Sequence, residues 1–426
     1  MVAVSERLYD SDSFLSTFAG AVTGVREMTG SGGGTVWQLA LNRTAFYPTS
    51  GGQPFDTGTL HAANQPAPEI AVEEVEEDGQ GTVWHFVREP LAVGTPVEGR
   101  IDWERRFDHM QQHTGQHLLS AVFLRELHLP TVSFHLGASA STIDLAGASL
   151  AHHSLERVER IANEIAGEDR PVTSRHVSRA EAEAMLAAGE LRKLPDREGA
   201  IRLIEIAGCD RNACGGTHVR STGQIGGLLV RRVEKVTRGL RVEFVCGMRA
   251  VRTARADAAV LNETAALLSV GAAELPAAVA RLQSEARAGA KERQKLREEL
   301  AIFQAAELAA EAPLENSFRL VVRAWKNRDR DEVRLLASRT AAAAPRTAVF
   351  FSAQDADPVR ILIARSADLP FDCGLILREA LAQLGRRGGG TPDLAQGEVP
   401  AAQEAALRDA VTTAMRNAAA DAQPAH

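Results

Sequence analysis

The pattern of hydrophobic and polar residues changes along the chain and divides it into four regions. Residues 1–100 predict β structure, because strand-like runs such as TVWQLAL (35–41) are separated by segments rich in Gly and Pro, among them YPTSGGQPFDTG (47–58). Several short strands divided by such turns predict a small barrel-like or sandwich module.

Residues 101–250 mix helical and strand patterns. One helical pattern runs from Arg105 to about Leu127, and a clearly amphipathic one covers residues 153–167. The segment SRAE (178–181) has the spacing of a capping box and predicts the start of another helix. The segment 225–247 predicts a hairpin that turns near Arg238 and Gly239. Helices and strands grouped in this way predict an α+β domain.

Residues 251–312 predict a helical arm, since they hold one proline, Pro276, and much Ala, Glu, Leu and Arg. A spacing of three and four continues through this region, but small and charged residues interrupt it, which favours an arm or a helical hairpin over a long coiled coil. The positions with this spacing are Val279, Leu282, Ala286, Gly289, Arg293, Leu296, Leu300 and Phe303. After Pro313 we expect a last domain, residues 313–426, of the α/β type.

Charge and cysteine content narrow the setting. The 426 residues carry 48 basic and 55 acidic side chains, a net charge of −7, so a nucleic acid would have to bind a local basic patch, and we expect no DNA partner. No apolar run approaches the roughly 18 residues of a membrane span, and the N-terminus lacks a signal-peptide pattern, so we expect no membrane partner. Four scattered cysteines favour a reducing cytoplasm, with cysteine used for metal binding or catalysis.

Two short motifs carry candidate metal ligands. CGGTHV places Cys214 four residues before His218, and DHMQQHTGQHLL places His113 four residues before His117 on a predicted helix, so that both imidazoles project from one face. One thiolate and three imidazoles are a set that suits zinc.

Each motif alone has an ordinary alternative. The histidine pair could be a helical surface, and CGGTH could be a Gly-Gly turn with a buried thiol. His109, four residues before His113, even forms a second overlapping pair. Because both motifs occur together in a chain with four cysteines, we favour a metal site.

These motifs resemble those of a known family. HTGQHLL followed about a hundred residues later by CGGTHV is similar to the editing domain of alanyl-tRNA synthetase and of its freestanding relatives, the alanyl-tRNA editing proteins. AFYPTSGGQPFDTG (45–58) resembles the glycine-rich N-terminal module of that family. LGRRGGGTPDLAQG (384–397) resembles the C-terminal domain of the synthetase, which DHH-type phosphoesterases share.

The resemblance implies four parts of a long-form editing protein, in the family's order. They are a glycine-rich β-barrel-like module (1–100), an α+β zinc editing domain (101–250), a helical arm (251–312) and a C-terminal α/β domain (313–426). The last part would bind the tRNA elbow or form a homodimer. The synthetase's aminoacylation module has no counterpart in the first region, so we expect no tRNA charging.

The resemblance also implies an activity and a cofactor. One zinc ion per chain would be held by the positions that match the family's metal ligands, His113, His117, Cys214 and His218. The chain would hydrolyse, in trans, the ester of tRNA(Ala) mischarged with serine or glycine. Such editing is needed because an alanine pocket cannot strongly exclude either the smaller glycine or a serine that adds one hydroxyl.

Four protein ligands raise a difficulty, since a closed tetrahedron marks a structural zinc. For a catalytic site two alternatives stay open: one ligand, His218 first, is loose or acts through water, or the metal expands to five ligands. A non-catalytic tRNA-binding protein with a structural zinc site is the rival function. Phosphoester hydrolysis by the C-terminal domain is a second rival, disfavoured because the Asp-His-His metal module of those enzymes has no counterpart here.

The substrate contacts are less marked in the sequence. Ser133 is our candidate for a hydrogen bond to the hydroxyl of a substrate serine. The alternative is that it is an ordinary strand serine, and Thr131 is the next candidate. Gln53 lies in a loop that the family packs beside the editing pocket, and its alternative is a simple turn. Thr114 and Gln116 are expected behind the metal ligands or at the surface.

Two basic segments are candidates for phosphate contacts, namely the predicted hairpin and the Arg386-Arg387-Gly-Gly-Gly loop. A solvated face and a flexible loop are their alternatives. The basic residues of the hairpin are Arg231, Arg232, Lys235, Arg238 and Arg241.

Overall fold

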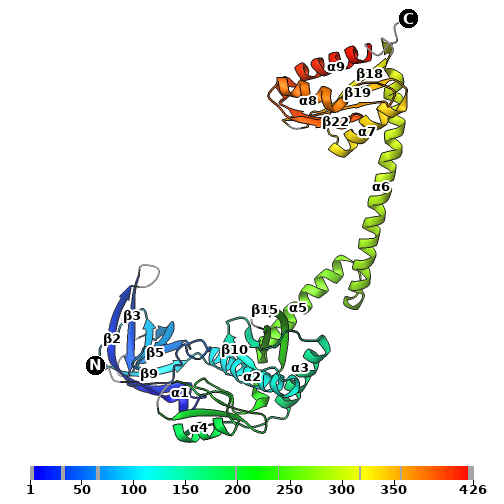
Figure 1. Ribbon diagram of the computed structural model, residues 1–426. Coiled ribbons are helices and arrows are strands. Elements are labelled where there is room, and N and C mark those ends of the chain that lie inside the picture. The colour runs from blue at the N-terminus through cyan, green and yellow to red at the C-terminus, as the bar shows by residue number, and fades with distance from the viewer. Residues whose placement is uncertain are drawn as a thin grey trace. The chain divides into compact units, whose positions relative to one another are not determined.

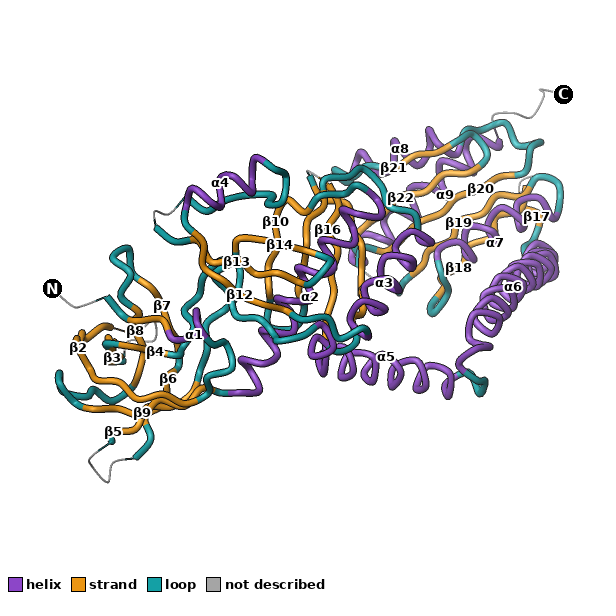
Figure 2. Tube along the Cα trace, turned by 90° about the horizontal axis from the view of Figure 1, so that it is seen from below, coloured by secondary structure: helices purple, strands orange, loops and turns teal. Residues whose placement is uncertain are grey.

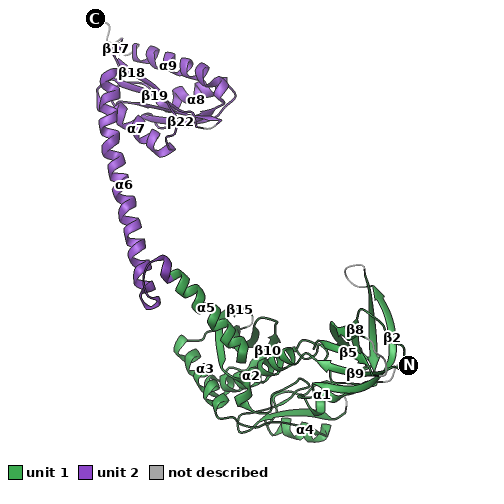
Figure 3. Ribbon diagram, turned by 180° about the vertical axis from the view of Figure 1, so that it is seen from behind, with its two compact units in different colours: residues 1–264 green, residues 265–426 purple. Residues whose placement is uncertain are grey.

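The structure, a computed structural model, describes residues 4–29, 34–63, 68–196, 199–237, 239–315, 318–355 and 357–420. The chain forms two compact units, Met1–Thr264 and Ala265–His426 (Figure 3). Helices and strands are present in both units, which confirms the expected mixed α+β class (Figure 1).

The N-terminal module is built on a seven-stranded antiparallel sheet with the order β6-β5-β9-β2-β3-β8-β7. Its edge strands β6 and β7 are separated in the chain only by Glu73, so the sheet curls until its two edges lie close together. The strands are β2 (Thr17–Thr29), β3 (Thr35–Leu41), β5 (Gly58–Ala62), β6 (Ile70–Val72), β7 (Glu74–Glu77), β8 (Val83–Val87) and β9 (Pro96–Ile101). Two short strands, β1 (Glu6–Arg7) and β4 (Arg43–Thr44), pair in parallel beside the helix α1 (Leu8–Ser11).

Alternating residues of these strands face a single apolar core. Along β9 every second residue is buried, as expected for a strand with one face on the core. Phe46 and Leu60 are fully buried in this core. The loop between β4 and β5 connects two strands of this module.

The second part of unit 1 surrounds one long helix, α2 (Trp103–Leu127). Two sheets contact α2, with the orders β10-β11-β16-β15 and β12-β13-β14 (Figure 2). The further elements are β10 (Thr131–Leu136), β11 (Ser141–Leu145), α3 (His152–Gly167), β12 (Val172–Val177), α4 (Arg179–Ala187), β13 (Ile201–Ile206), β14 (Asp210–Ala213), β15 (Leu228–Val236) and β16 (Gly239–Cys246).

Several local predictions are confirmed in this part. The expected helices are present as α2 and α3, and the expected hairpin as β15 and β16. Helix α4 begins at the capping residue Ser178, whose hydroxyl accepts a hydrogen bond from the backbone N–H of Glu181.

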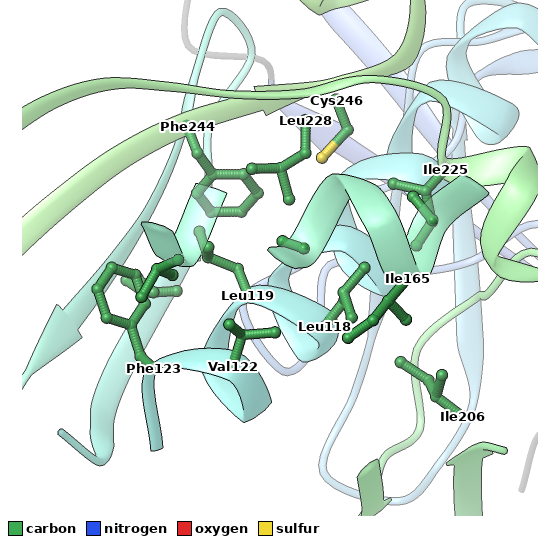
Figure 4. Close-up of a cluster of buried hydrophobic side chains, with 14 of the residues drawn as sticks. Leu118, Leu119, Val122, Phe123, Ile165, Ile206, Ile225, Leu228, Phe244 and Cys246 are labelled. Atoms are coloured by element: carbon green, nitrogen blue, oxygen red, sulfur yellow. The ribbon is translucent and has the colours of Figure 1, made fainter. Parts of the chain in front are cut away.

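Helix α2 is buried on all sides in its middle, from His109 to Phe123. Leu118, Leu119, Val122 and Phe123 pack into an apolar cluster with side chains of α3, β13, β15 and β16 (Figure 4). Gly115 allows the helix to approach β16, because a Cβ at this position would lie 2.3 Å from the Sγ of Cys246. Four polar residues of the same helix, His113, Gln116, His117 and Ser120, line the site described below.

Helix α5 (Gly247–Leu267) leads to α6 (Leu275–Glu311), which has Pro276 in its first turn, where proline is tolerated. Large side chains with the predicted three-four spacing, such as Leu296, Leu300 and Phe303, are exposed on α6. Among the described residues no single helix is long and apolar enough to span a membrane. The segments Gly247–Leu267 and Ala272–Glu311 meet that criterion only jointly, as a pair bent by 72°.

The C-terminal unit contains a six-stranded mixed sheet with the order β17-β18-β19-β20-β22-β21. Ala348 and Phe350 of β19 face a cluster with α8 and α9, while Val349 and Phe351 face a second cluster with α6 and α7. The elements are β17 (Leu314–Glu315), β18 (Phe318–Trp325), α7 (Arg330–Ala343), β19 (Thr347–Ala353), β20 (Val359–Arg365), α8 (Cys373–Gln383), β21 (Gly388–Gly390), β22 (Leu394–Val399) and α9 (Glu404–Ala420).

Candidate metal centre

The four predicted ligands converge at one place in unit 1. His113 and His117 are one turn apart on α2, and Cys214 and His218 follow strand β14. One donor atom of each residue lies within 4.8 Å of the donors of the other three. The Sγ of Cys214 is 3.4 Å from Nε2 of His113 and 3.3 Å from Nε2 of His218.

The second glycine of CGGTH, Gly216, explains how the loop approaches α2 so closely. A Cβ on Gly216 would lie only 2.1 Å from Cε1 of His113. Any other residue here would push the loop away from the helix and separate Cys214 from His113. Gly216 is therefore part of the site.

Each histidine is held by a different outer partner at its Nδ1 atom. Nδ1 of His113 is 2.8 Å from Oε1 of Gln53, and Nδ1 of His218 is 3.1 Å from Oγ1 of Thr114. Nδ1 of His117 is 3.3 Å from Oδ2 of Asp210. Partners of this kind fix ring orientation and leave Nε2 free to bind a metal ion.

Electrostatics favour the protonation states that a metal ion requires of Cys214 and His218. Burial alone would raise the pKa of the Cys214 thiol, but the neighbouring His113 and His218 hold that pKa well below its usual value, which favours the thiolate. Burial and the nearby His113 lower the pKa of His218 to about 3, so its imidazole is neutral. Burial opposes protonation of His117, but Asp210 and the Cys214 thiolate together outweigh burial and raise the pKa of His117 to about 9.

The donor set fits a metal ion. In a tetrahedral zinc site with the usual bond lengths, a thiolate sulfur and an imidazole nitrogen lie about 3.6 Å apart. The sulfur–nitrogen distances of 3.3 and 3.4 Å are close to this separation. All four residues are buried or half-buried, so the group His113, His117, Cys214 and His218 could hold a metal ion.

A cavity of about 340 Å³ opens beside the metal centre. Three of the four candidate ligands, His113, His117 and Cys214, line it, whereas His218 borders a separate pocket of about 140 Å³ behind them. The other lining residues are Tyr47, Ser50, Gly51, Gln116, Ser120, Thr131, Phe134, Arg192, Lys193, Asn212, Ala213, Gly215 and Gly216.

Three family models match the chain. The model for "tRNA synthetases class II (A)" matches residues 6–105, that for the "Threonyl and Alanyl tRNA synthetase second additional domain" residues 201–242, and that for the "DHHA1 domain" residues 317–417. The second match includes Cys214 and His218 of the metal centre.

Curated relatives extend the similarity over nearly the whole chain. The alanyl-tRNA editing protein AlaX-L of Pyrococcus horikoshii is 29% identical over 418 residues, which cover 94% of this chain and 96% of that protein. The alanyl-tRNA editing protein Aarsd1 of Bos taurus is 34% identical over 62% of this chain and 58% of that protein.

The chain is a relative of the alanyl-tRNA editing proteins. It also resembles an alanine–tRNA ligase of Pyrococcus furiosus, with 35% identity over 69% of this chain and 31% of the ligase. The chain thus spans about a third of the length of the ligases that it matches.

The structure does not bring Ser133 into the cavity. A β-bulge lies between Thr131 and Ser133 on β10, so the side chain of Ser133 is directed to Oδ2 of Asp144, 2.8 Å away, while Thr131 lines the cavity. On a strand without a bulge, Thr131 and Ser133 would lie on the same face. Thr131, the second candidate, has the position that was expected of Ser133.

Gln53 is wholly buried and bonded to His113, and it is not among the residues that line the cavity. Thr114 lies behind the ligands as expected and contacts His218. Gln116, in contrast, lines the cavity, because its neighbours on α2 at positions 113 and 117 both face it.

The basic residues of the β15–β16 hairpin are largely paired. Arg231 forms an ion pair with Asp257, Arg232 with Glu234 and Arg241 with Asp144. Arg238 lies outside the described residues. These pairs reduce the positive charge available to phosphate groups.

In the C-terminal unit, by contrast, Arg330, Arg360 and Arg387 line a hollow of about 240 Å³ next to Gly388. Arg360 is paired with Glu398 there.

Sequence reasoning missed Asp210 and Ser120. Asp210 lies four residues before Cys214, and an acidic residue next to a metal motif is a usable signal for an outer partner. Ser120 lies three residues after His117 on α2, a spacing that returns to the same face of a helix.

Proposed function

We propose that the chain is a zinc-dependent hydrolase that cleaves, in trans, the aminoacyl ester of mischarged tRNA(Ala), with serine as the main amino acid and glycine as the second. The observation that carries this proposal is the CysHis₃ group at the wall of an open cavity. A zinc ion that serves only structure is usually enclosed by its ligands, whereas a catalytic one borders a space for substrate. The similarity to proteins named as alanyl-tRNA editing proteins supports the choice of substrate.

When bound, a zinc ion supplies Lewis acidity toward an ester carbonyl and activates water at neutral pH. His113, His117, Cys214 and His218 would hold it. The outer partners Gln53, Thr114 and Asp210 keep the three imidazoles oriented, so little reorganisation is needed when the ion binds.

One wall of the cavity offers polar groups for a serine side chain. Thr131 donates from Oγ1 to Oγ of Ser120 at 2.7 Å, and Nε2 of Gln116 donates to the same oxygen at 2.9 Å. Oε1 of Gln116 is buried and has no hydrogen-bond partner among the described residues. A substrate hydroxyl that joins this group can donate to Oε1 of Gln116, whereas the methyl of alanine leaves that oxygen unpaired, which supports selectivity for serine.

The mouth of the cavity has positive charge for the 3′ end of tRNA. Arg192 and Lys193 both line it. Arg192 is already bonded to Asp210 and Asn212, whereas Lys193 has no ion-pair partner among the described residues. We assign Lys193 to a phosphate contact near the ester, and the arginine-lined hollow of the C-terminal unit to a second contact with tRNA.

A deacylation assay with the purified full chain tests the proposal. Ser-tRNA(Ala) and Gly-tRNA(Ala) should be hydrolysed and Ala-tRNA(Ala) spared. A chelator should abolish the activity, and added zinc should restore it. Tight tRNA binding with a full complement of zinc but no hydrolysis would instead establish the rival function, a tRNA-binding protein with a structural zinc.

A further inference from the structure

Gln53 belongs to the N-terminal module but is part of the metal centre. It lies in the loop between β4 and β5, and its side chain is 0% exposed. It is 60 positions before His113 and 164 positions before Thr217, yet it contacts both. The chain therefore brings together three distant segments at this one carboxamide.

The local sequence explains how Gln53 reaches this place. Ser50 and Gln53 exchange two backbone hydrogen bonds, of 3.1 and 2.9 Å, across Gly51 and Gly52. Both glycines have positive φ, +54° and +83°, as a two-residue hairpin turn requires. The turn then packs on β10: the carbonyl of Gly52 accepts from the backbone N–H of Leu136, and a Cβ on Gly52 would lie 2.8 Å from the ring of Phe134.

The carboxamide of Gln53 connects the two halves of the metal centre. Its Oε1 is 2.8 Å from Nδ1 of His113 and accepts from the backbone N–H of Thr217 at 3.0 Å. Its Nε2 donates to Oγ1 of Thr217 at 2.8 Å. The glutamine is thus bonded both to helix α2 and to the CGGTH loop.

These contacts fix the tautomer of His113. With the amide oxygen held in place by Thr217, Gln53 presents an acceptor to Nδ1, so Nδ1 carries the proton and Nε2 carries the lone pair. Nε2 is the atom that faces Cys214. A histidine without this acceptor could also protonate Nε2, and that form cannot bind a metal ion through Nε2.

We propose that Gln53 is a positioning residue for the metal ion: it holds His113 in the metal-binding tautomer and joins helix α2 to the CGGTH loop. The inference rests on the proposed metal centre but not on the proposed substrate. Thr114 also joins α2 to this loop, through Nδ1 of His218 and the backbone N–H of Val219, but Gln53 alone among the three outer partners comes from the N-terminal module. It therefore makes the N-terminal module part of metal binding.

Zinc affinity of the full chain, measured by competition with a chromogenic chelator, tests this role without any activity assay. Gln53→Leu keeps the approximate volume but offers no acceptor, so the affinity should fall by roughly 10- to 100-fold, the range for outer partners of metal ligands. Gln53→Glu keeps an acceptor for both His113 and Thr217, so its affinity should equal or exceed that of the original chain. Gln38→Leu is the matched control, since Gln38 is a buried glutamine of β3 outside the site, and its affinity should not change.

A second measurement separates positioning from a general effect on folding. Thermal unfolding of the zinc-free variants reports the stability of the protein itself, and the gain on adding zinc reports binding. If Gln53 positions His113, added zinc should stabilise Gln53→Leu less than it stabilises the original chain. It should stabilise Gln53→Glu as much as the original chain. Unchanged zinc affinity in Gln53→Leu, or equal losses in both variants, would overturn the inference, whether or not the chain hydrolyses any ester.

Discussion

The carboxylate of Asp210 lies 3.3 Å from Nδ1 of His117, with both side chains only 7% exposed. Asp210 is also ion-paired with Arg192 and hydrogen-bonded to Asn212. The carboxylate is thus fixed from two sides while it orients the imidazole. Such a carboxylate–histidine pair strengthens a metal ligand by making it more basic.

Asp210→Asn should therefore weaken zinc binding. The amide has the same shape but no charge, and the expected loss of affinity is roughly 10- to 100-fold. The chelator competition that is used for Gln53 measures it. Asp196→Asn, a change at an exposed aspartate of the loop that follows α4, is the control and should leave the affinity as it was.

The ligand assignment itself is tested by metal content. We expect about one zinc ion per chain in the purified protein. Cys214→Ala should lose most of it, whereas Cys246→Ala and Cys373→Ala should retain it, because these two thiols are buried in apolar clusters and are not members of the ligand group. Full zinc content in Cys214→Ala would rule out the proposed ligand set.

His109 provides a sharper control, since it lies one turn before His113 on α2. Its ring is 3% exposed and it is not a member of the ligand group. His109→Ala should keep the zinc. Loss of zinc in this variant alone would mean that the metal uses the first histidine pair of the helix instead of the second.

The spacing of residues within single elements was sufficient to predict much of the site. His113 and His117 share a helix face, and Cys214 and His218 share a loop, so local patterns identified four residues that the fold brings together. Helices α2 and α3 and the β15–β16 hairpin were also predictable, because their periodicity is local.

Contacts between distant segments could not be predicted in this way. Gln53 and His113 are 60 positions apart, and no pattern in either segment indicates that they meet. The strand order of the sheets is equally non-local. Ser133 shows a different limit: a single β-bulge changed which residue of β10 faces the cavity.

The buried imidazole of His85 predicts sensitivity to acid. Nε2 is 2.8 Å from Oγ1 of Thr44 and Nδ1 is 2.9 Å from the carbonyl of Leu39. Burial lowers the pKa of His85 from 6.5 to about 4, although the bond to Leu39 opposes the shift. Between these pH values the unfolded chain binds a proton that the folded chain does not, so stability falls as the pH is lowered from 6.5 to about 4.

Urea unfolding midpoints between pH 7.5 and pH 5 check this dependence. His85→Gln removes the titrating group, so its midpoint should change less with pH than that of the original chain. His152→Gln, at an exposed histidine of α3, should show the original dependence. A pH dependence that is the same in His85→Gln would assign the acid sensitivity to other groups.

Unit 1 contains all four candidate ligands, which predicts that it is sufficient for hydrolysis. A protein that ends after Thr264 should deacylate at saturating tRNA but bind tRNA more weakly. A protein that ends at Gly247 should deacylate less well than one that ends after Thr264, because it lacks Arg249. The side chain of Arg249 is 6% exposed and bonds to Asp108 of α2 and to the carbonyl of Gly137. A folded 1–264 protein without turnover would show that the C-terminal unit contributes to the active site.

The last prediction concerns the choice between serine and alanine. A metal-activated water has no preference between the two esters, so the cavity wall must discriminate. The wall offers Thr131, Ser120 and Gln116, joined by hydrogen bonds of 2.7 and 2.9 Å. An analogue that lacks the hydroxyl leaves Oε1 of Gln116 unpaired, and we expect Ser-tRNA(Ala) to be cleaved at least about 100-fold faster than Ala-tRNA(Ala).

Thr131→Val tests this wall with a change of one hydroxyl for one methyl group. The ratio of the two rates should narrow, mainly through slower hydrolysis of Ser-tRNA(Ala), because the loss is specific to the substrate that uses the hydroxyl. Zinc content should not change, since Thr131 is not bonded to any metal ligand.

Ser133→Ala is the matched control two residues along the same strand: its hydroxyl is bonded to Asp144 outside the cavity, so its ratio of the two rates should remain that of the original chain. The opposite result is also informative. If the ratio of the Ser-tRNA(Ala) rate to the Ala-tRNA(Ala) rate narrows in Ser133→Ala but not in Thr131→Val, the serine-binding wall lies on the other side of the β-bulge. Equal rates on both substrates in the original chain would contradict the editing role itself, whatever metal the site holds.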